Sequence, residues 1–419
     1  MASVLEAVRP NLATGTAPGA TPARPSAEAL IQRARDLLPA LKQRAQDTER
    51  ARRVSADTTA MIREAELYKI MLPARWGGFE YGYAEFMDLI IEIGSGCAST
   101  GWCFGLANVH QWLGSLFPLQ TQEEIWGEDP TALVCGSYPP TGEARAVPGG
   151  YMLRGDKWSF ASNCDNSSWA LLGVLFPADD ENGGKPTPGF LAVPRHQYEI
   201  LDDWHVVGLA GTGSNTIVIR DEIFVPRHRM LTFPQASSGK SPGTAVHANP
   251  LYKMPFLAAV PISICSPGLG ALQGAINDFT EMASVRVSRG AVTGGGSKLA
   301  ELQSIQIRLA EAESCLDAAK LLFRRDIEDV QNSVARGESI SVDQRIRNRR
   351  DHAFAIKLAR QGIDALYEAV GGHYLQLNTS IQRHWRDVHA VSKHISMNWD
   401  WVGSMVGQYR LGLEPKGQY

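Results

Sequence analysis

The feature that most constrains the fold of this sequence is a change in the spacing of its apolar residues along the chain. From about residue 27 to 124 they recur every three or four residues on a charged background, as in amphipathic helices. From about 132 to 231 they alternate with polar residues or form short runs between turn residues, as in strands. From about 251 to 407 the helical spacing returns. The order predicts helices, then a compact β-domain of six to eight strands, then a helical bundle.

These boundaries predict an α+β fold with four segments. Residues 1–26 are rich in Ala, Thr, Pro and Gly and lack the pattern of a secretory signal, so we expect a disordered arm. Residues 27–124 are expected to form the N-terminal helical domain, and residues 125–235 the β-domain. Residues 236–419 are expected to form the bundle and to carry the subunit contacts, because helices of roughly 30 residues pack as antiparallel bundles.

The charge balance excludes some partners. The chain has 41 basic and 44 acidic residues and a net charge of -3, which argues against a nucleic-acid or polyanion surface. The basic run Arg345 to Arg350 falls in a helical pattern and is interpreted as a solvated face or a subunit contact. The six cysteines are scattered and form no CxxC pair, as is typical of small buried side chains in a reducing cytoplasm.

Two long segments carry no charged residue. Residues 93–122 are dense in Gly, Ser, Thr, Asn and Gln and contain His110, which favours a buried helix beside a pocket over a membrane span. Residues 254–277 contain three prolines, which disfavour a spanning helix. We therefore expect no membrane partner.

Two patterns look like known motifs, but the sequence around them does not support the usual function of those motifs. Residues 208–213, GLAGTG, look like a dinucleotide-binding turn, but no helical pattern follows them. His384, His389 and His394 repeat every five residues, so they do not share one helix face as metal ligands would. We expect no metal site and no NAD(P)H site on this chain.

The stretch from Gly155 to Phe176, GDKWSFASNCDNSSWALLGVLF, places about ten small polar residues without glycine between two strand patterns. A plain hairpin needs two turn residues, usually with glycine. The stretch is either a long solvated loop or a wall of hydroxyls and amides against a flat ligand.

Other positions have two readings each on local evidence. A histidine in an apolar segment can be a core residue or a site residue, a Gly pair can end a helix or admit a phosphate to the backbone, and arginines before a Gly-rich break can be solvated or bind phosphate. The positions concerned are His110, His394, Gly371, Gly372, Arg286 and Arg289.

Taken together, three stretches resemble the acyl-CoA dehydrogenase fold over residues 30–419. They are GGYMLRGDKWSFASN, VVGLAGTGSNTIVIRDEIFVPRHRML, and EAVGG followed by IQRHWRD. The resemblance implies an N-terminal helical domain, a central β-barrel and a C-terminal helical bundle.

Within that fold the chain departs from the dehydrogenases. These usually carry a catalytic Glu nine residues beyond the Arg of the last R-D pair, and from Arg386 that offset reaches Ile395. Removing a Cα proton needs a base in reach, and this segment offers no carboxylate. The stretches STGWCFGLANVHQWLGSLF, QEEIWGEDP and YKMP instead resemble oxygenase components of two-component flavin monooxygenases that hydroxylate phenols. A dehydrogenase-like flavoenzyme and an N- or S-oxygenating relative are the alternatives.

The resemblance implies roles for individual residues. At the flavin ring it places Trp102, Ser137 and Ser162, with Ser162 near N5 and Ser159 as its rival. At the phenol it places His110 and Ser137, and it makes His394 a second active-site histidine. Relatives carry Tyr where this chain has Ser396, a position assigned to the substrate. The flavin phosphate would meet Gly371, Gly372, Gln303 and either Arg286 or Arg289, partly across a subunit boundary.

The same resemblance implies the cofactor and the partners. Reduced FMN or FAD arrives as a diffusible co-substrate from a separate NAD(P)H:flavin reductase, and its reaction with O₂ gives the hydroperoxide that hydroxylates an aromatic small molecule. A cytoplasmic homotetramer without nucleic-acid partners is expected. The aromatic substrate and the choice between FMN and FAD stay open.

Overall fold

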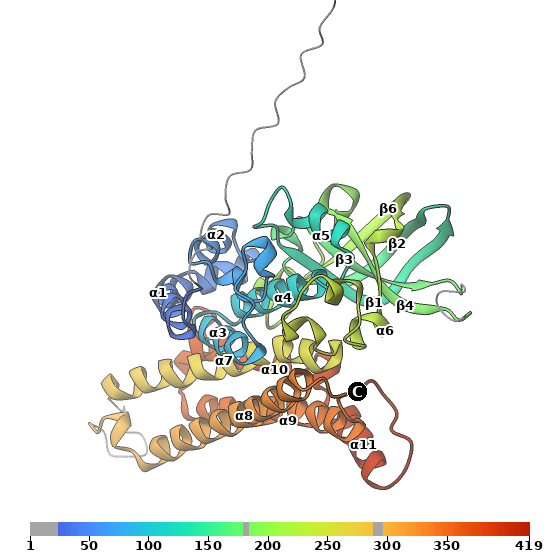
Figure 1. Cartoon of the computed structure of the whole chain (residues 1–419). Coiled ribbons are helices and arrows are strands. Elements are labelled where there is room, and N and C mark those ends of the chain that lie inside the picture. Colours follow the sequence, from blue (N-terminus) through green and yellow to red (C-terminus); the bar gives the residue numbers. More distant parts are fainter. Residues whose placement is uncertain (1–23, 179–183, 288–295) are drawn as a thin grey trace, which may run out of the picture.

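The computed structural model describes residues 24–178, 184–287 and 296–419 (Figure 1). In these parts of the chain, helices come first, a sheet follows and a second set of helices closes the fold, as the apolar spacing predicts. Most of the predicted arm, residues 1–23, lies outside the described residues.

Five helices precede the sheet. Two begin at serine caps, since the side chains of Ser26 and Ser55 each accept a backbone N–H from the first helical turn. The third and fourth are separated only by an extended Cys97. The helices are α1 (Ala27–Ala51), α2 (Ala56–Glu64), α3 (Tyr83–Gly96), α4 (Ala98–Gly114) and α5 (Leu119–Trp126). Every residue of α4 is buried, as the uncharged segment predicts.

The central sheet is open, which corrects the predicted barrel. Its strands are β1 (Val134–Val147), β2 (Gly150–Ala161), β3 (Trp169–Phe176), β4 (Thr187–Pro194), β5 (Glu199–Ile200), β6 (Asn215–Pro226) and β7 (Met230–Thr232). Their order is β5-β6-β2-β1-β3-β4-β7, so β5 and β7 remain the two edges. A barrel requires the edges to pair. Here β5 has two residues, and the chain leaves the sheet before β6.

The two faces of the sheet serve different cores. Leu171, Phe190 and Ala192 belong to the large apolar core that they share with the helices. Their neighbours Leu172 and Leu191 point to a second core inside the sheet domain. This alternation follows from the two-residue period of a strand.

Six helices follow the sheet, and α7 is central among them (Figure 1). They are α6 (Phe233–Ser237), α7 (Phe256–Val285), α8 (Gln303–Ala335), α9 (Val342–Ala369), α10 (Ser380–Val391) and α11 (Trp399–Arg410). By length and composition α7 could cross a membrane, but 88% of its most apolar window is buried. It packs on α3, α4, α9 and α10. This is the behaviour of a core helix.

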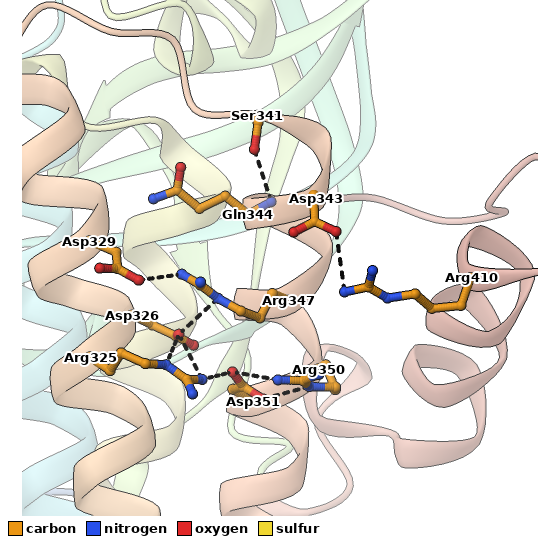
Figure 2. A network of polar contacts seen from close by, with 10 residues as sticks. All are labelled: Arg325, Asp326, Asp329, Ser341, Asp343, Gln344, Arg347, Arg350, Asp351 and Arg410. Carbon is orange, nitrogen blue, oxygen red and sulfur yellow. Dashed lines mark hydrogen bonds and ion pairs between the residues drawn. The ribbon is translucent and has the colours of Figure 1, made fainter.

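The basic run at the start of α9 does more than form a solvated face. Figure 2 shows it joined to α8: Arg347 lies 2.6 Å from Asp329 and 3.5 Å from the buried Asp326. Arg350 holds the neighbouring Asp351 at 2.7 Å. Arg325 of α8 contacts both buried carboxylates. The arginines therefore neutralise acidic groups enclosed between α8 and α9.

Candidate active site

A chain of buried hydroxyl groups starts at Trp102 of α4. The Trp102 Nε1–H donates to Ser162 Oγ at 2.9 Å, just after β2. Ser162 Oγ lies 2.6 Å from Ser214 Oγ, which lies 2.7 Å from Thr212 Oγ1. Thr212 Oγ1 contacts the Leu209 carbonyl at 2.9 Å. The contacts join α4, the β2–β3 corner and the loop before β6, so three separate segments meet here.

His394 adds a fourth segment to this place. Its ring lies edge-on to Trp102, with 6.1 Å between ring centroids. The Ser396 N–H donates to His394 Nδ1 at 3.2 Å, which leaves the Nε2 side to carry the proton of a neutral imidazole. Burial, aided by the positive charge of Arg349, lowers the pKa of His394 to about 4. The structure thus gathers Trp102, Ser162 and His394 as predicted.

His110 lies on the same helix as Trp102, against the sheet. It is 1% exposed, and neither ring nitrogen makes a hydrogen bond of ordinary geometry. Burial lowers its pKa to about 3, while the backbone at Val134 acts in the opposite direction. A Cβ added at Gly136 of β1 would come 2.9 Å from His110 Nε2, so this glycine admits the ring. At working pH His110 is a neutral acceptor in an apolar setting.

Tyr138 is the neighbour of His110 that the sequence reasoning missed. Its ring stands perpendicular to the imidazole at 5.6 Å, and its buried hydroxyl has no hydrogen-bond partner in the part of the chain that the structure describes. Phe190 and Phe256 pack on its other sides. Buried polar groups are nearly always hydrogen-bonded, so the unpaired groups on His110 and Tyr138 are candidates for contact with a polar ligand atom.

The polar corner between β2 and β3 is packed rather than solvated. Ser162, Asn163 and Ser167 are buried. Ser159, the rival of Ser162, uses its hydroxyl to accept from Thr216, and its carbonyl accepts from Ser137 Oγ at 2.7 Å. Both contacts hold Ser159 and Ser137 within the sheet.

Phe160 marks the corner as a special site. Its φ of 64° is left-handed, which is unfavourable for a bulky residue, and 67% of its surface is exposed. Its ring lies edge-on to Trp204 at 6.0 Å. Strained backbone of this kind clusters at binding sites.

A second group of predicted residues lines an open cleft of about 1150 Å³ between α7 and α10. Arg286 and Gly372 both belong to its wall, with the cations Lys42 and Arg383. Arg286 lies over the ring of Tyr374 and, among the described residues, has no carboxylate partner. A Cβ at Gly371 or Gly372 would meet no atom within 4 Å, so a ligand can approach this backbone closely. The residues fit a phosphate group.

Not all predicted residues are brought together within one chain. Gln303 is exposed at the first residue of α8 and does not line the cleft. Arg289 lies outside the described residues. Ser396 is half-buried and reaches the site through its backbone contact with His394.

The three histidines of the five-residue repeat lie in different surroundings. Within residues 24–178, 184–287 and 296–419, no three His, Cys, Asp or Glu side chains are grouped for a metal ion. His384 lies 3.5 Å from Asp278, and His389 lies 2.8 Å from Asp364. Each of these two histidines lies beside a carboxylate, whereas His394 lies edge-on to Trp102. The position of the dehydrogenase Glu holds Ile395, which is 79% exposed.

Thr212 and Ser214 were not predicted either. Thr212 lies within the glycine-rich stretch 208–213 and Ser214 directly follows it, and neither was assigned to the site. The available signal was the run Thr212, Gly213, Ser214, whose small hydroxyl residues come just before a strand. Its partners are distant in sequence, so their contact depends on the tertiary fold.

Comparison with known proteins identifies the family. Residues 24–121 match the acyl-CoA dehydrogenase N-terminal domain, and residues 262–399 match the acyl-CoA dehydrogenase C-terminal domain. A FADH₂-dependent resorcinol hydroxylase, oxygenase component, from a Rhizobium species is 45% identical over 93% of this chain and 96% of its own length. The flavin-dependent monooxygenase oxygenase subunit HsaA of Rhodococcus jostii is 37% identical over 91% of this chain and 98% of its own.

Solved structures agree. The crystal structure of the 3-HSA hydroxylase from a Rhodococcus species superimposes with a TM-score of 0.86 at 35% identity, covering 93% of this chain and 98% of that one. With these likenesses over nearly the whole length, the chain belongs to the oxygenase components of flavin-dependent aromatic hydroxylases, built on the acyl-CoA dehydrogenase fold.

Proposed function

We propose that this chain takes reduced flavin from a separate reductase and hydroxylates a phenol beside its existing hydroxyl, with a second ring oxygen present as in resorcinol. One atom of O₂ enters the ring and the other leaves as water, with both electrons supplied by the flavin. The observation that carries the proposal is that His110 and Tyr138, whose rings meet edge-on, both have polar groups without a hydrogen-bond partner among the described residues. His110 lies on the helix that also presents Trp102. The resorcinol hydroxylase named above supports the substrate class.

His110 would act on the phenol. Because it is neutral, its free nitrogen can accept the phenolic proton, and the resulting phenolate is a stronger carbon nucleophile. Moving a proton onto a buried imidazole is favourable only if the negative phenolate stays beside it. Because His110 is buried, it should therefore accept a proton only when the phenol is bound beside it. Ser137 and Ser396 would border this pocket.

The flavin ring would lie against Trp102, Ser162 and His394, with N5 facing Ser162. When bound, reduced flavin supplies the oxygen-activating chemistry. The chain supplies a dry surround: Trp102 is 7% exposed and Ser162 is 2% exposed. Excluding water from an oxygen-activating site suppresses wasteful release of peroxide.

The phosphate of the flavin would bind in the cleft with Arg286, Gly371 and Gly372. Gln303, and Arg289 beyond the described residues, would complete the contact from the same or a second subunit. The cleft is open, and the cations Lys42, Arg286 and Arg383 outnumber the carboxylates Asp278 and Glu281 on its wall, which supports this placement. Either FMN or FAD fits this chemistry, and the FADH₂ in the name of the resorcinol hydroxylase favours FAD.

We also propose the assembly and the setting. Residues 27–124, 125–235 and 236–419 act as three domains, the last of which assembles a cytoplasmic homotetramer. Strongly exposed apolar side chains on the outer helices support such an assembly, among them Leu321, Leu375 and Trp401. Light scattering that gave the mass of a single chain would contradict it.

The test replaces His110 by Asn, which has a similar size. With reduced flavin, O₂ and a phenol panel, His110→Asn should keep consuming oxygen but release peroxide. Its hydroxylated product per oxygen should fall by about 100-fold, the lower range for loss of a general base. The matched control is His352→Asn, since His352 is equally buried and unpaired but lies on α9. If His110→Asn also stopped oxygen consumption, or kept full product yield, the proposed role would be wrong.

An acyl-CoA dehydrogenase-like activity is the second reading to exclude. Such an enzyme would bleach bound oxidised FAD on adding an acyl-CoA without oxygen. An N- or S-oxygenating relative would convert amines or sulfides in preference to phenols. Neither result is expected here.

A further inference from the structure

The hydroxyl chain behind Ser162 has a defined direction. An indole N–H can only donate and a carbonyl can only accept, so the ends at Trp102 and Leu209 are fixed. If Thr212 donates to the Leu209 carbonyl, then Ser214 must donate to Thr212 and Ser162 must donate to Ser214. In this arrangement every proton of the three hydroxyls is used.

The direction decides what Ser162 can still offer. Its oxygen accepts from Trp102 and donates to Ser214, so one lone pair remains and no proton does. Reduced flavin carries a hydrogen on N5 and is a donor there. Oxidised flavin has no hydrogen on N5 and is an acceptor. With a free lone pair and no free proton, Ser162 can accept a hydrogen bond from N5 of reduced flavin but cannot donate one to N5 of oxidised flavin.

We infer that Thr212 and Ser214 are positioning residues that make the Ser162 hydroxyl bind reduced flavin in preference to oxidised flavin. The inference rests on the proposed placement of N5 beside Ser162. Ser162 can donate to N5 of oxidised flavin only if the hydrogen bonds among the three hydroxyls reverse their direction. This reversal breaks the hydrogen bond from Thr212 to the Leu209 carbonyl. The loss of one net hydrogen bond of this kind corresponds to an affinity for oxidised flavin that is lower by roughly threefold to tenfold. The lower end applies if Trp204, which also donates to the Leu209 carbonyl, compensates in part.

This preference suits an enzyme that receives its flavin by diffusion. The incoming reduced flavin matches the chain as it stands. The outgoing oxidised flavin meets a lone pair instead of a donor and is released more readily. The selection is built from protein groups behind the flavin and needs no movement of a loop.

The test measures binding rather than turnover. Under anaerobic conditions, the whole chain is titrated with FMN and with photoreduced FMN, and the two dissociation constants are compared. The wild type should bind the reduced form more tightly. Thr212→Val should lower the preference by about threefold to tenfold, chiefly by tightening oxidised FMN, because Ser162 regains a proton to donate. A tenfold change would appear as a shift of about 30 mV in the potential of bound flavin.

Three further variants make the result decisive. Thr212→Ser should restore the preference, because it returns the hydroxyl. Ser214→Ala should act like Thr212→Val and serves if that variant folds poorly. Ser167→Ala should change nothing, since Ser167 is a buried hydroxyl in the same corner that bonds to Asn163 instead.

The outcomes separate the inference from the proposed function. If Thr212→Val and Ser214→Ala keep the wild-type preference while Ser162→Ala alters it, the chain behind Ser162 has no role. A wild type that bound both forms equally would also overturn the inference. If Ser162→Ala leaves the binding of both forms unchanged, the proposed placement of N5 itself is wrong.

Discussion

At the scale of single residues, Tyr138 should decide which phenols are preferred. Its ring lies edge-on to His110 among apolar residues and its hydroxyl has no partner among the described residues, so it can hold a second oxygen on a ring whose first hydroxyl meets His110. Tyr138→Phe should lower kcat/KM for the best dihydroxybenzene by about tenfold and leave phenol unaffected, because one hydrogen bond is lost. Steady-state rates with phenol and the three dihydroxybenzenes would measure the ratio.

The control for this prediction is Tyr198→Phe. Tyr198 also has a buried, unpaired hydroxyl, but it packs in the second core of the sheet domain. It should leave the ratio unchanged. An equal fall for phenol and for the dihydroxybenzenes in Tyr138→Phe would indicate a structural role and contradict substrate recognition.

The same scale shows what the sequence could and could not predict about the site. Trp102, Ser162 and His394 were assigned through resemblance, and the fold places them together. Tyr138 was missed because nothing local distinguishes it, and Thr212 was missed because the partners of its hydroxyl run are distant in sequence. Tyr138 follows Ser137 on a strand. Its role depends on its contact with a helix that packs across this strand. Contacts of this kind are properties of the tertiary fold and leave no spacing rule in the chain.

At the scale of elements, the predicted strand pattern from Tyr198 to Pro226 splits into β5, a loop and β6. Side chains take over the backbone bonding there: Asn215 Oδ1 accepts the N–H groups of Asp203 and Trp204. The Thr216 N–H is in turn bound by Asp203. Such side-chain contacts compete with a sheet ladder. They explain why the sheet is open where the resemblance implied a closed barrel.

The bulge in β1 should be sensitive to a small change in side-chain size. Between Ser137 and Gly142 the pairing of β1 with β3 shifts, and a Cβ at Gly142 would come 2.1 Å from the ring of Trp158. Gly142→Ala should therefore lower the free energy of unfolding by roughly 1–3 kcal/mol, because the buried indole has no room to move. Urea denaturation followed by circular dichroism would measure the loss.

A glycine with free space gives the comparison. A Cβ at Gly407 in α11 would meet no atom within 4 Å. Gly407→Ala should raise the free energy of unfolding by about 0.5–1 kcal/mol, since alanine loses less entropy in a helix. Equal effects of the two variants would show that the contact with Trp158 is unimportant.

At the scale of the whole molecule, the order of helices, sheet and helices was predicted correctly. The two helical parts, however, do not have separate apolar cores. One apolar core includes residues of α3, α4, α7 and α9 together with one face of the sheet. Apolar spacing tells which face of a helix is buried, and it does not tell which partner covers it. The site lies where this shared core meets the sheet, because α4 contacts both.

The bundle should make the stability of the molecule depend on pH through Asp326. Burial, and next the negative charge of Asp351, raises the pKa of Asp326 to about 7 from the ordinary 3.8, although Arg325 and Arg347 act in the opposite direction. Between about pH 4 and pH 7 the folded protein therefore keeps a proton at Asp326 that the unfolded chain releases. The stability from this proton is fully present below pH 4 and is lost as the pH rises through 7.

Asp326→Asn lacks this dependence. The melting temperature of the wild type minus that of Asp326→Asn should therefore fall by several degrees from pH 4.5 to pH 7.5. A difference that stayed constant, or rose with pH, would mean that Asp326 is already ionised in the folded bundle and that the arginines in Figure 2 outweigh its burial.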